Sequence, residues 1–129
     1  GCRAITGDAD SQRIENRLPG ADSNPYLALA ATLGAGYLGI KEKIEPTPET
    51  QGGAYDLKLD RKYQVPSDLG EAAKLFKQSE SAKNLFGETF VNHFANTRTW
   101  EYDEFKKNKN PFDSSIISTW ELERYFEII

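Results

Sequence analysis

A six-residue stretch near the start of the chain, residues 13–18, alternates between charged and uncharged side chains. Successive side chains of a β-strand point to opposite faces, so Arg13, Glu15 and Arg17 are expected on one face. Turn-forming residues precede the stretch and a Pro-Gly pair follows it. The pattern predicts a strand hairpin over residues 2–18. Because an isolated hairpin is marginal in water, its apolar face needs further sheet.

The remainder of the chain, residues 24–129, has mainly helical spacing of its apolar residues. A helix over 24–44 is predicted to begin at an Asn or Ser cap followed by Pro25, and its many Ala and Gly residues predict deep burial. After a long loop at 45–66, further helices are expected at 68–78, at 87–107 with a short stretch at 79–86 leading in, and at 118–126. The predicted fold class is α+β: an N-terminal β-hairpin, as a piece of a larger sheet, followed by four or five packed helices.

Charge and composition exclude several classes of protein. The chain carries 16 Lys and Arg against 20 Asp and Glu, a net charge of −4, so a basic surface for nucleic acid is not expected. The local cluster of Lys106, Lys107 and Lys109 is interpreted as the solvated end of a helix. No apolar run approaches the ~20 residues that span a membrane. The single cysteine, Cys2, permits no internal disulfide and favours a cytoplasmic location.

Two motifs have ordinary structural explanations. Residues 34–39 match the dinucleotide fingerprint G-x-G-x-x-G, but that motif must lie between a strand and a helix, and here it falls inside a predicted helix. The glycines are therefore interpreted as sites of close helix packing. His93 is the chain's only histidine and lies on a predicted helix. We interpret it as a packed or surface residue rather than a metal ligand.

The charged strand face admits two interpretations. It is either a solvated face whose ion pairs each contribute ~0–1 kcal/mol, or an anion site beside a metal. In the second case the carboxylate of Glu15 holds Mg²⁺, and the guanidiniums of Arg13 and Arg17 bind phosphate or carboxylate groups through two nitrogens at once.

The sequence around this strand is similar to that of a known family. Residues 13–31, RIENRLPGADSNPYLALAA, closely resemble the glutamine synthetase family, in which an R-x-E-x-R strand leads through a Pro-containing turn into a helix. Residues 3–7 resemble the preceding strand of that family, and residues 119–126 resemble its C-terminus. The resemblance implies that residues 1–129 form the C-terminal part of a glutamine synthetase catalytic domain. The absence of methionine also leads us to expect a piece of a longer protein.

The resemblance implies a role for four residues. Glu15 matches the glutamate that ligates the Mg²⁺ or Mn²⁺ bridging the nucleotide phosphates. Arg13 matches an arginine at the phosphates of ATP, and Arg17 matches the arginine that helps to bind the substrate glutamate. Arg3 matches an upstream arginine near the transferred phosphate. Arg13 and Arg17 are thus the expected catalytic residues, and Arg3 and Arg13 the expected nucleotide-binding residues.

The reaction implied is that of an ATP-dependent carboxylate–amine ligase. ATP phosphorylates the γ-carboxylate of glutamate, and ammonia then displaces the phosphate to give glutamine. Ligases that join glutamate to a polyamine or monoamine are the alternative within this class. A non-catalytic structural relative, or an inactive folding unit, is the alternative from another class. The resemblance places the other metal ligands upstream and implies a ring-shaped homo-oligomer for the full-length parent, so we expect no activity from these residues alone.

Overall fold

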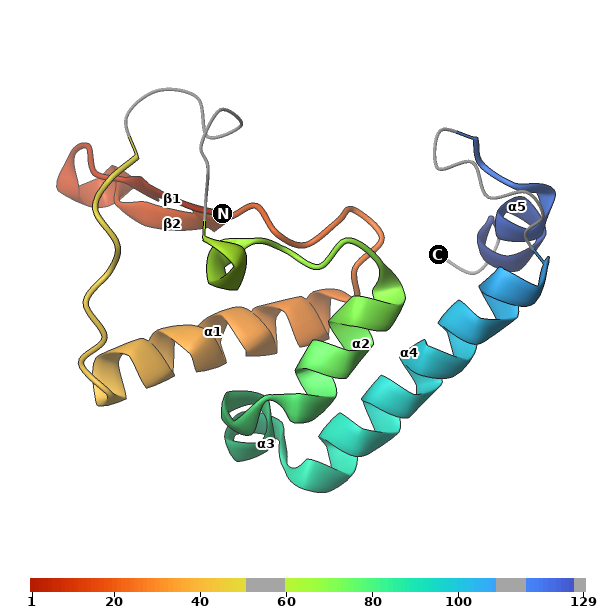
Figure 1. Cartoon of the computed structure of the whole chain (residues 1–129). Helices are drawn as coiled ribbons and strands as arrows, with labels where there is room; N and C mark the ends of the chain where they lie inside the picture. The colour runs from red at the N-terminus through yellow and green to blue at the C-terminus, as the bar shows by residue number, and fades with distance from the viewer. Residues whose placement is uncertain (51–59, 109–115, 127–129) are drawn as a thin grey trace. The chain divides into compact units, whose positions relative to one another are not determined.

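A computed structural model describes residues 1–50, 60–108 and 116–126. The fold is α+β, as predicted, and divides into two compact units, residues 1–47 and residues 48–129 (Figure 1). The first unit holds strands β1 and β2 and helix α1. The second holds helices α2 to α5 and a short 3₁₀ turn at Arg61–Tyr63.

The strands of the first unit, β1 (Cys2–Ile5) and β2 (Arg13–Asn16), form the predicted antiparallel hairpin. A 3₁₀ turn at Ala9–Ser11 joins them, and the Ser11 amide donates to the carbonyl of Asp8 at 2.8 Å. The register pairs Arg3 with Glu15. Strand β2 is shorter than the predicted arm, although the Arg17 amide still donates to the Gly1 carbonyl at 3.1 Å. The sheet has two strands within the residues that the structure describes.

Helix α1 (Pro25–Lys41) begins where the sequence predicts. The side chain of Asn24 accepts hydrogen bonds from the amides of Tyr26 and Leu27, and proline occupies the first turn. The helix ends before the predicted residue 44, because Lys43 adopts a left-handed conformation with φ of 54°. A hydrogen bond from Asn16 of β2 to Thr32 of α1 connects the hairpin to this helix.

The expectation that α1 is deeply buried is wrong for this chain. None of its residues is buried, and a row of large apolar side chains lies open along it. Tyr26 and Ile40, near its two ends, are 81% and 82% exposed. The reason is geometric: the hairpin, with two four-residue strands, is too small to cover a helix of 17 residues.

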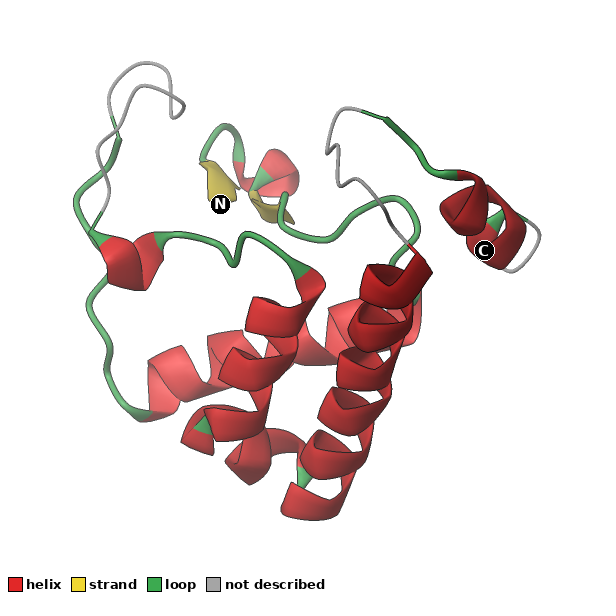
Figure 2. Ribbon diagram, turned by 45° about the vertical axis from the view of Figure 1, so that its right-hand side comes forward, coloured by secondary structure: helices red, strands yellow, loops and turns green. Residues whose placement is uncertain are grey.

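The second unit consists of α2 (Leu69–Gln78), α3 (Glu80–Phe86), α4 (Glu88–Asn108) and α5 (Thr119–Tyr125). Figures 1 and 2 show α2 and α4 side by side, with α3 connecting them. Gly87 separates α3 from α4 with φ of 81°, a conformation that favours glycine. Helices α2, α4 and α5 confirm the three helices predicted here, and the short stretch predicted to lead into α4 forms helix α3.

Small residues and aromatic rings fill the interface of α2, α3 and α4. Val91 and Ala95 of α4 are completely buried, and Ala73 of α2 is 4% exposed. The rings of Phe76 and Phe94 meet edge to face with centroids 5.7 Å apart, an arrangement that aromatic pairs favour. This compact interface makes α4 a rigid platform.

Within the described residues, no helix is both long and apolar enough to cross a membrane.

Candidate functional site

The hairpin brings together three of the four charged residues singled out in the sequence. Arg3 on β1 lies directly opposite Glu15 on β2, and directly paired side chains project from the same face of a sheet. Nη2 of Arg3 lies 2.7 Å from Oε2 of Glu15. Nε of Arg17 lies 3.3 Å from Oε1 of the same carboxylate. Glu15 thus stands between two guanidiniums.

Arg13 is on the same strand but contacts the turn instead of Glu15. Its Nη1 donates to the carbonyl of Ser11 at 3.0 Å. Alternation along β2 assigns its side chain to the face that carries Glu15. The predicted residues therefore form a cluster of the Glu15 carboxylate with the guanidiniums of Arg3 and Arg17. The guanidinium of Arg13 binds the turn that precedes the strand.

The opposite face of β2 points toward the helix of the same unit. Nδ2 of Asn16 donates to Oγ1 of Thr32 on α1 at 2.9 Å, and Thr32 donates onward to the carbonyl of Ala28 at 2.7 Å. Because Asn16 and Glu15 are consecutive strand residues, this contact directs the charged face away from α1. The charged cluster therefore stays accessible within this unit.

The ion pairs of the cluster are weak. The side chains of Arg3 and Arg17 are 60% and 62% exposed, and that of Glu15 is 37% exposed. Pairs this open contribute about 0–1 kcal/mol each, because water and salt screen them. The arginines are consequently free to exchange Glu15 for another anion at little cost.

The donor atoms at the cluster fit a divalent cation in part. Both oxygens of Glu15 are ion-paired, Oε2 with Arg3 at 2.7 Å and Oε1 with Arg17 at 3.3 Å, so a metal ion would replace one of these exposed and weak pairs. Mg²⁺ in proteins takes one or two carboxylates and completes its shell with water and phosphate oxygens. No group of three or more potential metal-ligating side chains occurs in the described parts of the chain. Glu15 therefore fits the role of a single ligand.

Two other sequence interpretations can be checked against the fold. The glycine-rich stretch at 34–39 lies wholly inside α1, as predicted, so it lacks the strand-to-helix setting of a dinucleotide site. His93 lies on α4 with an exposed side chain, also as predicted. Lys106 and Lys107 occupy the last turn of α4, whereas Lys109 lies outside the described residues.

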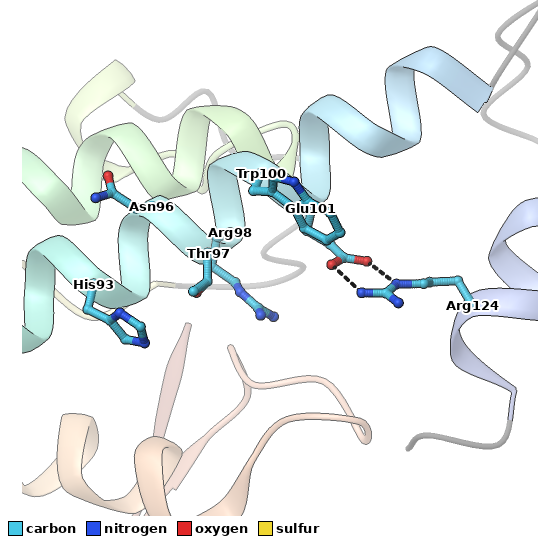
Figure 3. Close-up of a pocket in the computed structure, with 7 residues that line it drawn as sticks. All are labelled: His93, Asn96, Thr97, Arg98, Trp100, Glu101 and Arg124. Atoms are coloured by element: carbon cyan, nitrogen blue, oxygen red, sulfur yellow. Dashed lines mark hydrogen bonds and ion pairs between the residues drawn. The ribbon is translucent and has the colours of Figure 1, made fainter.

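A second polar cluster, which the sequence did not reveal, joins α4 to α5. Glu101 is 6% exposed. Its Oε1 accepts from Nε of Arg124 at 2.8 Å and from the hydroxyl of Tyr125 at 2.6 Å, while its Oε2 accepts from Nη2 of Arg124 at 3.0 Å. The guanidinium thus binds both carboxylate oxygens (Figure 3). We call these three residues the Glu101 clamp.

The clamp strongly shifts the ionisation of its members. Hydrogen bonds from Arg124 are the main reason why the pKa of Glu101 falls to about 2, although burial opposes the fall. Burial, followed by the hydrogen bond to Glu101, raises the pKa of Tyr125 to about 12. The carboxylate is therefore charged, and the phenol neutral, throughout the physiological range of pH.

A signal for the clamp was present in the sequence. Phe94, Arg98, Glu101 and Phe105 follow the 4-3-4 spacing of one helix face. A carboxylate in that row is unusual, because a buried carboxylate requires a partner. The partner lies 23 residues away, so the spacing identifies Glu101 as notable without identifying Arg124.

Comparison with known proteins places these features in a family. Residues 1–125 match the family model described as glutamine synthetase, catalytic domain. The chain belongs to the glutamine synthetase family. It is 39% identical over 98% of its length to a glutamate–isopropylamine ligase of Pseudomonas sp. It is 40% identical over 98% of its length to a type-1 glutamine synthetase of Dictyostelium discoideum, and 39% identical over 95% to a gamma-glutamylethanolamide synthetase of Streptomyces coelicolor.

The chain spans about a quarter of the length of these curated relatives: 26%, 23% and 24% in the same order. The named relatives are ligases; one is named for isopropylamine, one for an ethanolamide and one for glutamine. The roles of Arg3, Arg13, Glu15 and Arg17 remain predictions that rest on the resemblance and on the hairpin geometry.

Proposed function

We propose that this chain is the C-terminal segment of a glutamine synthetase-type catalytic domain, and that its hairpin forms one wall of an ATP-dependent ligase site. The observation that carries the proposal is the Arg3–Glu15–Arg17 cluster, held on one sheet face by the β1–β2 register in a chain of this family. The proposed substrates are glutamate, ATP, and ammonia or an amine.

The chemistry needs charge neutralisation at two places. Transfer of the γ-phosphoryl group spreads negative charge over its oxygens, and positive groups aimed at that charge lower the barrier. In the proposed arrangement, Arg3 and Arg13 neutralise phosphate oxygens, while Arg17 binds a carboxylate of glutamate. The planar guanidinium suits both anions, because it binds two oxygens simultaneously.

Glu15 is the proposed ligand of a Mg²⁺ or Mn²⁺ ion. When bound, the ion would supply further charge neutralisation at the nucleotide phosphates. The weakness of the exposed ion pairs that the metal would replace supports this assignment. Before a ligand binds, the carboxylate pairs with the guanidiniums of Arg3 and Arg17.

An amine is a specific second candidate for the nitrogen substrate. Two of the relatives named above are ligases for isopropylamine and ethanolamine by name, whereas the Dictyostelium relative is named as a glutamine synthetase. The test is phosphate release by the full-length protein with ATP, Mg²⁺ and glutamate, comparing ammonia, isopropylamine and ethanolamine. The compound with the highest kcat/KM identifies the acceptor, and release independent of every one of them would refute the ligase proposal.

The 129-residue chain alone is expected to show no turnover. One carboxylate cannot fix a metal, ATP and glutamate together, because the remaining ligands must come from other residues. Glutamate-dependent phosphate release by the isolated chain, exceeding that of a Glu15→Ala variant, would contradict this expectation.

Kinetics of two variants in the full-length protein separate the proposed roles. Glu15→Ala removes a group that acts on moving charge, so kcat should fall by orders of magnitude and the response to Mg²⁺ should weaken. Arg17→Ala removes a group that binds a charge already present in the ground state, so the KM for glutamate should rise. Loss of one member of a charged pair costs ~2–5 kcal/mol, or roughly 30-fold to several thousandfold.

The matched control is Arg61→Ala, which removes an exposed arginine from the other unit and should leave both constants unchanged. If Arg17→Ala changed only the KM for ATP, or if Glu15→Ala left the Mg²⁺ response intact, the assignment of roles on this strand would be wrong.

A further inference from the structure

The surface beside the Glu101 clamp is hollowed. The hollow has a volume of about 420 Å³ and is lined mainly by α4 residues between His93 and Glu101, together with Arg124 of α5. Figure 3 shows the side chains of His93, Arg98 and Glu101 along α4, with the guanidinium of Arg124 bonded to the carboxylate of Glu101. All of these residues belong to the second unit, away from the hairpin cluster in sequence.

Arg98 is the unusual member of this hollow. Its Nε is shielded from solvent and has no hydrogen-bond partner in the described parts of the chain. Cζ of its guanidinium lies 5.4 Å from the ring centroid of Phe94, which is within the range of a cation–π interaction. A buried donor without an acceptor is costly, so its position favours binding of an acceptor.

The charges around Arg98 favour a negative ligand. The only carboxylate that lines the hollow is Glu101, and both of its oxygens already accept hydrogen bonds from Arg124, with Tyr125 as a further donor. Among the lining residues, two guanidiniums thus stand against one carboxylate, a net charge of about +1 before His93 and the nearby Glu104, which also interacts with Arg124, are considered. The clamp also fixes Arg124, whose guanidinium lies against the ring of Trp100 at 5.6 Å.

We propose that this hollow is an oxyanion-binding site for a small molecule carrying a carboxylate or phosphate, with Arg98 as its principal ligand. The two terminal nitrogens of Arg98 would each donate a hydrogen bond to the anion, and Arg124 would add long-range attraction. The volume exceeds that of the anionic group alone, and the half-exposed Trp100 ring (54%) offers an apolar wall for the rest of the molecule.

The test is a titration of the 129-residue chain with phosphate and, separately, with acetate at constant ionic strength. The readout is the Nε–H resonance of Arg98 in proton–nitrogen NMR spectra, with that of Arg124 beside it. Saturable shifts confined to these signals and to residues around the hollow are expected. The more tightly bound of the two anions identifies the group that the site recognises. A linear response to both, or shifts spread over the whole surface, would overturn the proposal.

Two variants make the test specific. Arg98→Gln should weaken binding by about tenfold to a hundredfold, the loss expected for a charge-assisted hydrogen bond. The matched control is Lys106→Gln, which removes the same charge from the same helix at a residue that does not line the hollow. If both variants weakened binding equally, only general charge attraction would be at work and the proposed site would not exist. If Arg98→Gln disturbs the fold, Arg98→Lys serves as the test, because lysine keeps the charge but has a single nitrogen. Anion binding that is unchanged in Arg98→Lys would exclude the proposed contact through two nitrogens.

Discussion

Replacing Glu101 with glutamine tests how much one buried carboxylate contributes to the second unit. The pKa of Glu101 falls from 4.5 to about 2 in the folded protein, chiefly because of hydrogen bonds from Arg124. One pKa unit corresponds to about 1.4 kcal/mol, so the ionised clamp contributes about 3 kcal/mol to the free energy of unfolding. The side chain is only 7% exposed, so solvent screening is small. We expect Glu101→Gln to lower the unfolding free energy by about 3 kcal/mol at pH 7.

The same contribution must depend on pH in one direction. Because the folded-state pKa lies below the ordinary value of 4.5, the stabilisation is complete above about pH 5 and is lost as the pH falls toward about 2. The difference in stability between the parent and Glu101→Gln should therefore shrink over this range. Both proteins then carry an uncharged side chain at residue 101.

Urea denaturation followed by tryptophan fluorescence is the appropriate assay. Cζ of Arg124 lies 5.6 Å from the ring centroid of Trp100, and the ring of Trp120 on α5 lies 5.7 Å from that of Phe105 on α4, so both indoles report on the α4–α5 contact. Glu80→Gln is the control, since Glu80 pairs with a lysine while 79% exposed, and its removal should change stability by less than about 1 kcal/mol. The reasoning is refuted if Glu101→Gln matches that control at pH 7, or if the difference persists unchanged down to pH 3.

Further changes test packing and capping, each measured by urea denaturation with circular dichroism. Gly70→Ala should destabilise by about 1–3 kcal/mol, because its Cβ would lie 2.5 Å from the ring of Tyr102. A Cβ at residue 36 of α1 would meet open space, so Gly36→Ala should stabilise the helix by up to about 1 kcal/mol. Equal changes in stability for Gly70→Ala and Gly36→Ala would contradict both expectations. Asn24→Ala should cost about 1 kcal/mol of α1 stability. Ser118→Ala removes the capping box of α5 and should lower the stability of that helix by a similar amount. Unchanged helicity in either variant would contradict the proposed stabilisation by that cap.

The parts of this fold that could be predicted depend on neighbouring residues in the sequence. Asn24 followed by Pro25 predicts the start of α1 because capping and a fixed φ act within one turn. Alternation over residues 13–18 predicts the charged face because the period of a strand is two. The pairing of Arg3 with Glu15 then follows from hairpin geometry. Most of the candidate site was accessible to sequence reasoning for this reason.

Contacts between distant residues could not be predicted in the same way. Glu101 and Arg124 are separated by 23 residues, and many acids and bases of similar spacing exist in the chain. Helix α1 illustrates the converse problem, since small residues indicate that a helix can be approached closely but not whether anything covers it. Its burial depends on the partner surface, which the hairpin alone does not supply.

The Glu101 clamp has a consequence for the attachment of the last helix. It joins α5 to α4 through side chains of both helices, across a separation of 23 residues in the sequence. An uncharged residue at position 101 leaves the Arg124 guanidinium without its two-oxygen partner, and an unpaired charge of this kind is costly. A single substitution at residue 101 should therefore loosen α5 from α4 while the packing of α2 against α4 stays in place.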